Sequence, residues 1–339
     1  MSADTPVISC RNAWKIFGPD PVAFHKKMSL NMSFDDIRDA GYIAGVRGVS
    51  LNVQKGEMLV IMGLSGSGKS TLVRCFSRLH DITSGTITVE GQDIMSLPEK
   101  ELIDLRRSKM GMVFQSFGLL PHRSVLDNVA FPLEMRGQDK HTRRERALEV
   151  IKLVGLEGRE DYFPRELSGG QQQRVGIARS LAIEPDIWFL DEPFSALDPL
   201  IRKEMQDEFL RLQQLLSKTI VFITHDFDEA LRLADRIAIM KDGAIEQCDT
   251  PDQIVLHPAT EYVRKFTKDI DKARVVHAGI MATAETHGEG EPVDARATVK
   301  DLAKLLVHDT RDVIPVHKDG KIIGGMNRQD GLTVLLEAN

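Results

Sequence analysis

Three short apolar runs organise the first two thirds of the chain. They lie at residues 57–62, 186–190 and 219–223, and each is followed directly by small or polar residues. Continuous apolar runs of this length are typical of strands that are buried on both faces of a parallel sheet. Helical patterns follow the first run and precede the second, so the sequence predicts an α/β domain.

Polar residues mark the ends of several helices. Ser124 is placed to cap a helix that begins Val125-Leu126-Asp127, with Asp127 as an acidic variant of the capping box. Gly155 is expected to end a charged helix at about 142–154, whose charges we interpret as a solvated face. Ser33 starts a short capped helix at 34–38 in the same way.

A glycine-rich stretch lies between the first apolar run and a helix that begins near Lys69. It reads Gly63-Leu64-Ser65-Gly66-Ser67-Gly68-Lys69-Ser70, followed by Thr71. Its glycines allow successive backbone N–H groups to surround phosphates, and the helix adds its positive end. Lys69 should reach the β- and γ-phosphates, and Ser70 should offer its hydroxyl to Mg²⁺. A Gly/Ser turn with a surface lysine is the alternative, which the strand-loop-helix context disfavours.

Composition limits the class of protein. The 339 residues, 42% of them hydrophobic, suffice for one large domain and a small one. The net charge of −6 predicts no nucleic-acid partner. Cys10, Cys75 and Cys248 lie far apart and predict no disulfide framework, which fits a reducing cytoplasm. No apolar run approaches the roughly 20 residues that span a bilayer, and no signal-peptide plan opens the chain, so we expect membrane association only through a partner.

Two carboxylates follow the second apolar run. Asp191 and Glu192 would lie at the carboxyl end of a strand, where open α/β sheets bind ligands. Asp191 would hold Mg²⁺, directly or through water, and Glu192 would orient and deprotonate the attacking water. The alternative is a pair of surface acids at the start of a loop.

His225 follows the third apolar run and is expected at the same edge of the sheet. It is a candidate contact for the γ-phosphate and for the catalytic acid. A lone histidine is more often structural, but its position after a third buried strand favours function.

These motifs together resemble the nucleotide-binding subunit of an ABC transporter over about residues 7–270. The resemblance implies a P-loop NTPase (RecA-like) core with an antiparallel β part and an inserted α-helical subdomain at about 116–183. It also implies that ATP and Mg²⁺ are bound, that Gln115 is the Q-loop glutamine with a role in metal binding and catalysis, and that Ser195-Ala196-Leu197-Asp198 is the D-loop. His225 becomes the switch histidine. Phe17 fits the aromatic that stacks on adenine, although Trp14 lies only three residues away and either ring could be core.

Leu167-Ser168-Gly169-Gly170-Gln171 matches the signature segment of the same family. Ser168 and the two glycines would open a helix, where a hydroxyl, bare N–H groups and the helix dipole favour an anion. The resemblance implies that this segment completes the nucleotide site of a second copy, so that two chains sandwich two ATP molecules. An ordinary N-cap is the alternative.

The remaining partners are also implied by the resemblance. The helical insertion would contact a membrane permease, with Gln115 reporting the nucleotide state and Phe117, Leu119 and Leu120 forming a docking patch. The complete system would include an extracytoplasmic solute-binding protein. The chain would then lie at the cytoplasmic face of the inner membrane.

The sequence has an extra segment at about 18–45, and Leu64 lies within the phosphate loop. Both features resemble the corresponding positions of ATPases that serve quaternary-amine importers. That branch implies glycine betaine, proline betaine, choline or a similar osmolyte as cargo. The alternatives are an importer for another solute, such as an amino acid, and a soluble ABC ATPase of DNA repair, chromosome organisation or translation. The long coiled-coil insertions or paired cassettes usual in the soluble class are not visible in the sequence.

The composition changes after Phe266. We expect a linker at 271–292, which is polar and Gly-rich at 284–292, and a small C-terminal α+β motif at 293–339. A helix after Thr298, a hairpin around Asp319-Gly320 and a helix near 329–338 resemble one motif of the cystathionine-β-synthase type. About 48 residues are marginal for a separate core.

Overall fold

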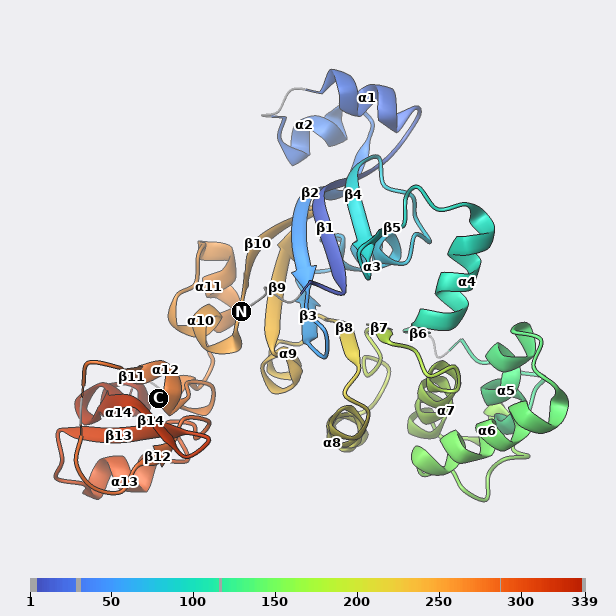
Figure 1. Ribbon diagram of the computed structural model, residues 1–339. Coiled ribbons are helices and arrows are strands. Elements are labelled where there is room, and N and C mark those ends of the chain that lie inside the picture. The colour runs from blue at the N-terminus through green and yellow to red at the C-terminus, as the bar shows by residue number, and fades with distance from the viewer. Residues whose placement is uncertain (1–4, 29–31, 116–117, 287, 337–339) are drawn as a thin grey trace. The chain divides into compact units, whose positions relative to one another are not determined.

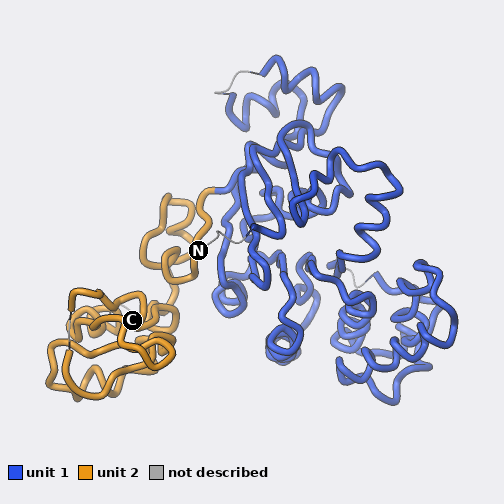
Figure 2. The backbone as a smooth tube through the Cα atoms, viewed as in Figure 1, with its two compact units in different colours: residues 1–245 blue, residues 246–339 orange. Residues whose placement is uncertain are grey.

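The computed structural model describes residues 5–28, 32–115, 118–286 and 288–336. The chain forms two compact units, residues 1–245 and 246–339, which Figure 2 colours separately. The candidate nucleotide-binding motifs all lie in unit 1.

A six-stranded sheet forms the centre of unit 1 (Figure 1), in the order β10-β9-β3-β8-β7-β6. Its strands are β3 (Met58–Met62), β6 (Met110–Val113), β7 (Ile187–Asp191), β8 (Thr219–Thr224), β9 (Arg236–Lys241) and β10 (Ala244–Asp249), of which β10 leads the chain into unit 2. β3, β7 and β8 are buried along their whole length and pair in parallel, as their apolar runs predict. Their carboxyl ends therefore meet at one edge of the sheet.

A second, antiparallel sheet has the order β2-β1-β4-β5. It consists of β1 (Ile8–Phe17), β2 (Ile43–Val53), β4 (Ser84–Val89) and β5 (Gln92–Asp93). Two short helices, α1 (Pro21–Lys27) and α2 (Phe34–Asp39), connect β1 to β2. Ser33 caps α2 as expected, since its Oγ accepts from the N–H of Asp36. The Asp36 carboxylate in turn accepts from the N–H of Ser33, which completes a capping box.

The helices of unit 1 fall into two groups. Those associated with the sheets are α3 (Lys69–Phe76), α4 (Glu99–Lys109), α8 (Pro199–Leu216) and α9 (Phe227–Leu233). The others are α5 (Val125–Met135), α6 (Lys140–Leu153) and α7 (Gly169–Leu181), with a short 3-10 helix at Pro164–Glu166. α5, α6 and α7 pack against one another in Figure 1 and form the inserted helical subdomain between β6 and β7.

One helix start differs from the expectation. α6 begins at Lys140 rather than near Thr142, because the side chain of Asp139 accepts hydrogen bonds from the N–H groups of His141 and Thr142. Ser124 caps α5 as expected by accepting from the N–H of Asp127, but the reciprocal bond of the expected capping box does not form. Gly155, with φ +69°, follows the end of α6.

Unit 2 contains a second sheet-and-helix core. Its sheet has the order β11-β14-β13-β12, built from β11 (Ala282–Thr283), β12 (Val293–Asp294), β13 (Val313–Lys318) and β14 (Lys321–Asn327). Its helices are α10 (Pro251–Leu256), α11 (Glu261–Thr267), α12 (Ala278–Met281), α13 (Ala303–His308) and α14 (Arg328–Leu336), with a 3-10 helix at Lys272–Arg274. The expected hairpin is present, with Asp319 and Gly320 both at positive φ in its turn.

The segment expected to be a linker is part of this core. Ala273, Val276 and Ala278 are buried together with Leu306, Ile314 and Val316, so unit 2 begins well before residue 293. The few apolar residues at 273–278 are too short a segment to give a periodic signal, so the composition indicates a later boundary. α13 also starts later than expected, since Thr298 and Asp301 cap a turn before it. The resemblance to a cystathionine-β-synthase motif stays a prediction, and residues 337–338 of its last helix lie outside the described residues.

The fold class expected for unit 1 is confirmed: a P-loop NTPase core with an antiparallel part and a helical insertion. In the described part of the chain, no helix is both long enough and apolar enough to span a membrane. Cys10 and Cys75 are buried, and Cys248 is partly buried.

Candidate functional site

The phosphate loop joins β3 to α3 and leaves two of its glycines no room for a side chain. Gly63 has φ +146°, and a Cβ added there would lie 2.2 Å from the carbonyl oxygen of Met240. Gly68 has φ +101°, and its Cβ would lie 2.1 Å from the carbonyl oxygen of Gly45. Only glycine permits both the backbone angle and this close approach, so the loop conformation depends on these positions.

Two polar side chains of the loop suit a phosphate ligand. Lys69 is buried, and its Nζ donates to the carbonyl oxygens of Gly63 at 2.8 Å and Leu64 at 3.0 Å. Burial lowers the pKa of this ammonium group, while Glu192 and Asp191 act in the opposite direction. Ser67 Oγ is buried without a hydrogen-bond partner among the described residues. An unpaired buried hydroxyl costs free energy, and a phosphate oxygen would satisfy it.

Ser70 and Asp191 meet at the end of the parallel strands. Ser70 lies in the first turn of α3, and its Oγ donates to Asp191 Oδ1 at 2.9 Å. Asp191 ends β7 and is buried. Burial raises the pKa of its carboxyl group, partly offset by the hydrogen bond from Ser70 and by the charges of Arg74 and Lys69.

This pair could hold a divalent cation. Among the described residues, no three His, Cys, Asp or Glu side chains gather in the way a metal site built from protein ligands alone requires. Mg²⁺, however, keeps several waters and is commonly bound by one or two protein oxygens together with phosphate oxygens. The hydroxyl of Ser70 and the carboxylate of Asp191 fit that requirement.

Glu192 lies at the centre of a second polar cluster. Its Oε2 accepts a hydrogen bond from Gln115 Nε2 at 3.3 Å and lies 3.1 Å from His225 Nδ1. Glu192 follows β7, Gln115 lies two residues after β6, and His225 follows β8, so neighbouring parallel strands bring the three together. The Glu192 side chain is 18% exposed whereas that of His225 is 59% exposed, so water can reach the cluster from the histidine side.

The two candidate adenine-stacking rings have different surroundings. Phe17 ends β1, and a Cβ added to Gly45 would lie 2.9 Å from both Phe17 Cε2 and Thr71 Cγ2, so the ring adjoins the first turn of α3. Lys15 Nζ lies 4.8 Å from the centre of the Phe17 ring. Trp14 instead packs against His25 of α1 with a ring separation of 5.1 Å. Phe17 is therefore the ring beside the phosphate-loop helix.

The signature segment and the D-loop make local contacts. Ser168 and Gln171 form a reciprocal capping box at the start of α7, with bonds of 3.3 Å and 2.9 Å. Ser168 and Gly169 are exposed, with Gly170 partly so. Asp198 is exposed and caps α8 by accepting from Ile201 N–H at 3.1 Å. These bonds do not join either segment to the phosphate loop of its own chain.

Two further contacts support the site: one made by Ser195, which the sequence places in the D-loop without this role, and one made by Arg202, which no motif marks. Glu192 has a left-handed backbone, with φ +46°, and its carbonyl oxygen accepts a 2.9 Å hydrogen bond from the hydroxyl of Ser195. Arg202 donates from Nη2 to Leu197 O at 3.1 Å and pairs through Nη1 with Asp226 at 3.5 Å. The spacing of Ser195, three residues after Glu192, is a detectable turn signal. The contact of Arg202 with Asp226 is long-range and has no such signal.

A phosphate loop after a buried strand, with acidic residues at the end of a neighbouring strand, defines a P-loop nucleotide hydrolase. The helical insertion and its capped Ser-Gly-Gly segment restrict the class further. The chain belongs to the ABC transporter family: the sequence profile of that family, described as ABC transporter, matches residues 46–195. The chain is accordingly an ATPase that couples ATP hydrolysis to transport.

Relatives of similar length support the assignment. The trimethylamine N-oxide transport system ATP-binding protein TmoW of Ruegeria pomeroyi is 77% identical over 335 residues, which cover 99% of this chain and 98% of that protein. TmoW of Pelagibacter ubique is 59% identical over 324 residues, 95% of each chain. The glycine betaine/proline betaine transport system ATP-binding protein ProV of Escherichia coli is 49% identical over 331 residues, which cover 97% of this chain and 83% of that one.

A solved structure has the same cassette fold. The ATP-binding cassette MJ0796, in a dimeric post-hydrolysis state bound to ADP and Pi, superposes with a TM-score of 0.60 and 34% identity. The match covers 72% of this chain and 98% of MJ0796.

Proposed function

We propose that the chain is the ATP-hydrolysing subunit of an importer for a small methylated-amine solute. The observation that carries the catalytic part is the convergence of Gln115 and His225 on one carboxylate oxygen of Glu192, next to the Ser70–Asp191 pair. Such a cluster can hold and deprotonate a water molecule beside the phosphates.

The residues of the site have different roles in ATP binding and hydrolysis. The backbone of Gly63–Gly68 and the side chains of Ser65, Ser67, Lys69 and Thr71 bind the ATP phosphates. Ser70 and Asp191, with Gln115, hold Mg²⁺, which neutralises phosphate charge when bound. Glu192 accepts the proton of the attacking water, and His225 orients that carboxylate and contacts the γ-phosphate. Phe17 rather than Trp14 stacks on adenine, since its ring adjoins Thr71.

The complete site requires a second copy of the chain. Ser168, Gly169, Gly170 and Gln171 lie at the N-terminus of a thirteen-residue helix, where N–H groups and the dipole favour an anion. Their local contacts leave this end exposed for the γ-phosphate held by the other copy, and the exposed Asp198 lies in the same interface. That MJ0796 forms a dimer supports this arrangement.

A groove of about 370 Å³ in unit 1 suits a helix of the membrane permease. Its lining is largely apolar, with arginines as well, and comprises Arg107, Met110, Gly111, Met112, Phe114, Gly118, Leu120, Phe131, Pro132, Met135, Arg179, Ser180 and Ile183. Methionines adapt to a partner surface, and the exposed Arg107 can pair with an acidic residue on it. Phe114 lies directly before Gln115, so this groove adjoins the glutamine that contacts Glu192. Phe117, also expected in the docking patch, lies outside the described residues.

The cargo is inferred from relatives. TmoW proteins are named for trimethylamine N-oxide and ProV for glycine betaine and proline betaine, and all of these solutes carry a fully substituted nitrogen. The high identity to TmoW over the whole chain makes trimethylamine N-oxide the first solute to test, with the betaines and choline next. In this assignment the chain lies at the cytoplasmic face of the membrane, bound to the permease, and a solute-binding protein selects the cargo on the other side.

Reconstitution tests the proposal. The chain would be purified with its membrane partner, placed in proteoliposomes, and assayed for ATP-dependent uptake of trimethylamine N-oxide, glycine betaine, choline, an amino acid and a sugar. We expect uptake of one of the first three only. Uptake of the amino acid alone would overturn the solute class and leave the importer assignment intact, and failure to associate with any membrane protein would overturn the importer assignment itself.

A further inference from the structure

The helical subdomain joins the sheet of unit 1 through two segments. The entering segment runs from the end of α4 through β6 to Gln115, and the leaving segment, residues 182–186, runs from α7 into β7. β6 and β7 are neighbours in the sheet, so the two segments lie side by side. Rotation of the subdomain relative to the sheet must bend these segments or carry them along.

Arg136 connects the two segments. It is the C-cap residue of α5, and its guanidinium donates to the carbonyl oxygen of Arg107 in α4, at 2.6 Å from Nε, and also from Nη2. Nη2 donates to the carbonyl oxygen of Ile183 as well, at 3.2 Å. Hydrogen bonds from a charged donor are about twice as strong as neutral ones, so a single side chain of the subdomain binds both segments firmly.

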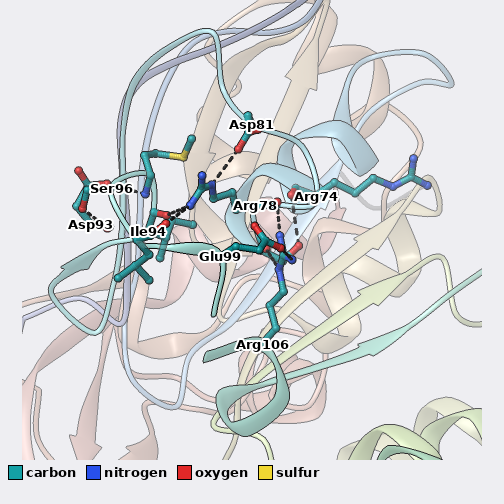
Figure 3. A network of polar contacts seen from close by, with 11 residues as sticks. Arg74, Arg78, Asp81, Asp93, Ile94, Ser96, Glu99 and Arg106 are labelled. Atoms are coloured by element: carbon teal, nitrogen blue, oxygen red, sulfur yellow. Dashed lines mark hydrogen bonds and ion pairs between the residues drawn. The ribbon is translucent and has the colours of Figure 1, made fainter. Parts of the chain in front are cut away.

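Arg106 connects the same helix to the phosphate-loop helix. Its Nε donates to the carbonyl oxygen of Ser77 at 2.8 Å, and its Nη2 donates to that of Arg78. Both carbonyls directly follow α3 (Figure 3). Arg78 has a left-handed backbone, with φ +49°. Its Nη1 donates to the carbonyl oxygens of Ile94 at 3.0 Å and Leu97 at 2.8 Å, which lie just before α4. The end of α3 and both ends of α4 are therefore held together.

We propose that Arg106 and Arg136 are positioning residues of the transport cycle, which make α4 a rigid connection between the phosphate-loop helix and the base of the helical subdomain. Neither side chain belongs to the ATP site. When ATP draws α3 into a new position, α4 moves with it through Arg106, and the subdomain follows through Arg136. The inference rests on the proposed function, because its consequence is movement of the groove that would hold the permease.

The carbonyl acceptors distinguish these arginines from ordinary surface ion pairs. Lys109–Asp186, at 2.7 Å, also lies at this junction, but it joins two partly exposed side chains that can turn independently of the backbone. A guanidinium that bonds backbone carbonyls instead follows the helix end itself. Lysine could supply the charge and donate from its single nitrogen, but it lacks the planar fork whose separate nitrogens reach carbonyl groups in two segments.

Hydrogen exchange tests the connection without the permease. In a Glu192→Gln chain, which keeps ATP intact, we expect ATP to slow exchange in α3 and to change exchange in α5. The readout is α5 because α7 begins with the segment that would contact the nucleotide of the other copy directly. Adding Arg106→Gln or Arg136→Gln should leave the response of α3 and remove that of α5. The exposed Lys100→Gln on α4 is the matched control. A retained response of α5 would overturn the inference.

Transport provides the second readout. In proteoliposomes, Arg106→Gln and Arg136→Gln should lower permease-stimulated hydrolysis and uptake about tenfold, while KM and kcat of the isolated chain change less than about twofold. The double variant should add little, because one connection is already broken, and the lysine variants should recover part of the loss. A parallel fall of all activities with the unfolding temperature would mean a structural role only. If ATP never stimulates uptake in the parent chain while its α5 responds to ATP, the proposed function fails and the connection stands.

Discussion

The hydroxyl of Ser70 donates a 2.9 Å hydrogen bond to Asp191, although 121 residues separate them in the sequence. The contact aligns the start of the phosphate-loop helix with the end of β7. Because Glu192 follows Asp191 directly, the same contact sets the distance between the phosphates and the proposed base. Two motifs that are distant in the chain thus form one site.

Replacing Asp191 with Asn should weaken the response to Mg²⁺. The amide keeps the size of the side chain and can still accept from Ser70, but it lacks the charge that attracts the cation. We expect ATP binding without metal to be nearly unchanged and the Mg²⁺ concentration needed for half-maximal hydrolysis to rise about 10- to 100-fold. Titration of phosphate release with Mg²⁺ measures this, with Asp104→Asn, at an exposed position of α4, as a carboxylate control outside the proposed site. An unchanged Mg²⁺ response would remove Asp191 from the metal site.

Replacing Glu192 with Gln should stop hydrolysis and keep ATP bound. The amide cannot accept a proton from water, so kcat should fall about 10²- to 10⁴-fold with little change in ATP affinity. Because the γ-phosphate would remain between the copies, ATP should also convert the variant into a stable dimer. Light scattering with ATP and with ADP checks this. A variant that stays monomeric with ATP would contradict the composite site.

Replacing Ser195 with Ala should impair Glu192 indirectly. Its hydroxyl holds the carbonyl oxygen of Glu192, whose backbone is in the left-handed region. Loss of one such bond is worth about 1 kcal/mol, or about fivefold in rate if the carboxylate loses its position. We expect kcat to fall by that factor at constant KM, with Ser195→Thr recovering part of it. If the Ser195→Ala variant and the parent chain have equal kcat, the turn holds Glu192 in position without this hydroxyl.

Local signals explain most of what could be predicted from the sequence. Continuous apolar runs are enough to predict the five-residue buried strands β3 and β7. The spacing of Ser168 and Gln171 alone predicts the capping box at the start of α7. The candidate residues Glu192 and His225 are predictable because each follows a buried strand, whereas only the family resemblance points to Gln115. The order β8-β7-β6 in the sheet brings all three together.

Contacts with backbone acceptors could not be predicted. Arg106 and Arg136 donate to carbonyl groups, which every residue carries, so no sequence pattern marks their acceptors. The start of unit 2 is not predictable for a related reason, since the short apolar segment with Ala273, Val275 and Val276 is buried only by the sheet that later strands form.

The ATP affinity should distinguish Phe17 from Trp14. Stacking of a base on an aromatic ring is worth about 1–3 kcal/mol, so Phe17→Ala should weaken ATP binding roughly 5- to 100-fold, and Phe17→Tyr should restore it. Trp14→Ala should change binding little, because its ring contacts His25. Fluorescent-nucleotide titration with and without Mg²⁺ provides the measurement. A larger loss from Trp14→Ala would reverse the assignment.

The pH dependence of unit 2 should depend on His277. Its Nδ1 and its backbone N–H both lie within hydrogen-bond distance of Asp252 Oδ1, at 2.9 and 3.0 Å, which joins α10 to the start of α12. The hydrogen bond with Asp252 raises the pKa of the imidazole above its ordinary 6.5, burial opposes this, and the charges of Asp252 and Asp301 add to the rise. A raised pKa means that the charged form stabilises the folded state. This contribution is complete below about pH 6.5 and is lost as pH rises through the folded-state pKa. We therefore expect His277→Gln to increase hydrogen exchange in α10 at pH 6 and to have a smaller effect at pH 9, with His257→Gln as the control. An effect that is equal at both pH values would mean that the charge of His277 contributes nothing to this contact.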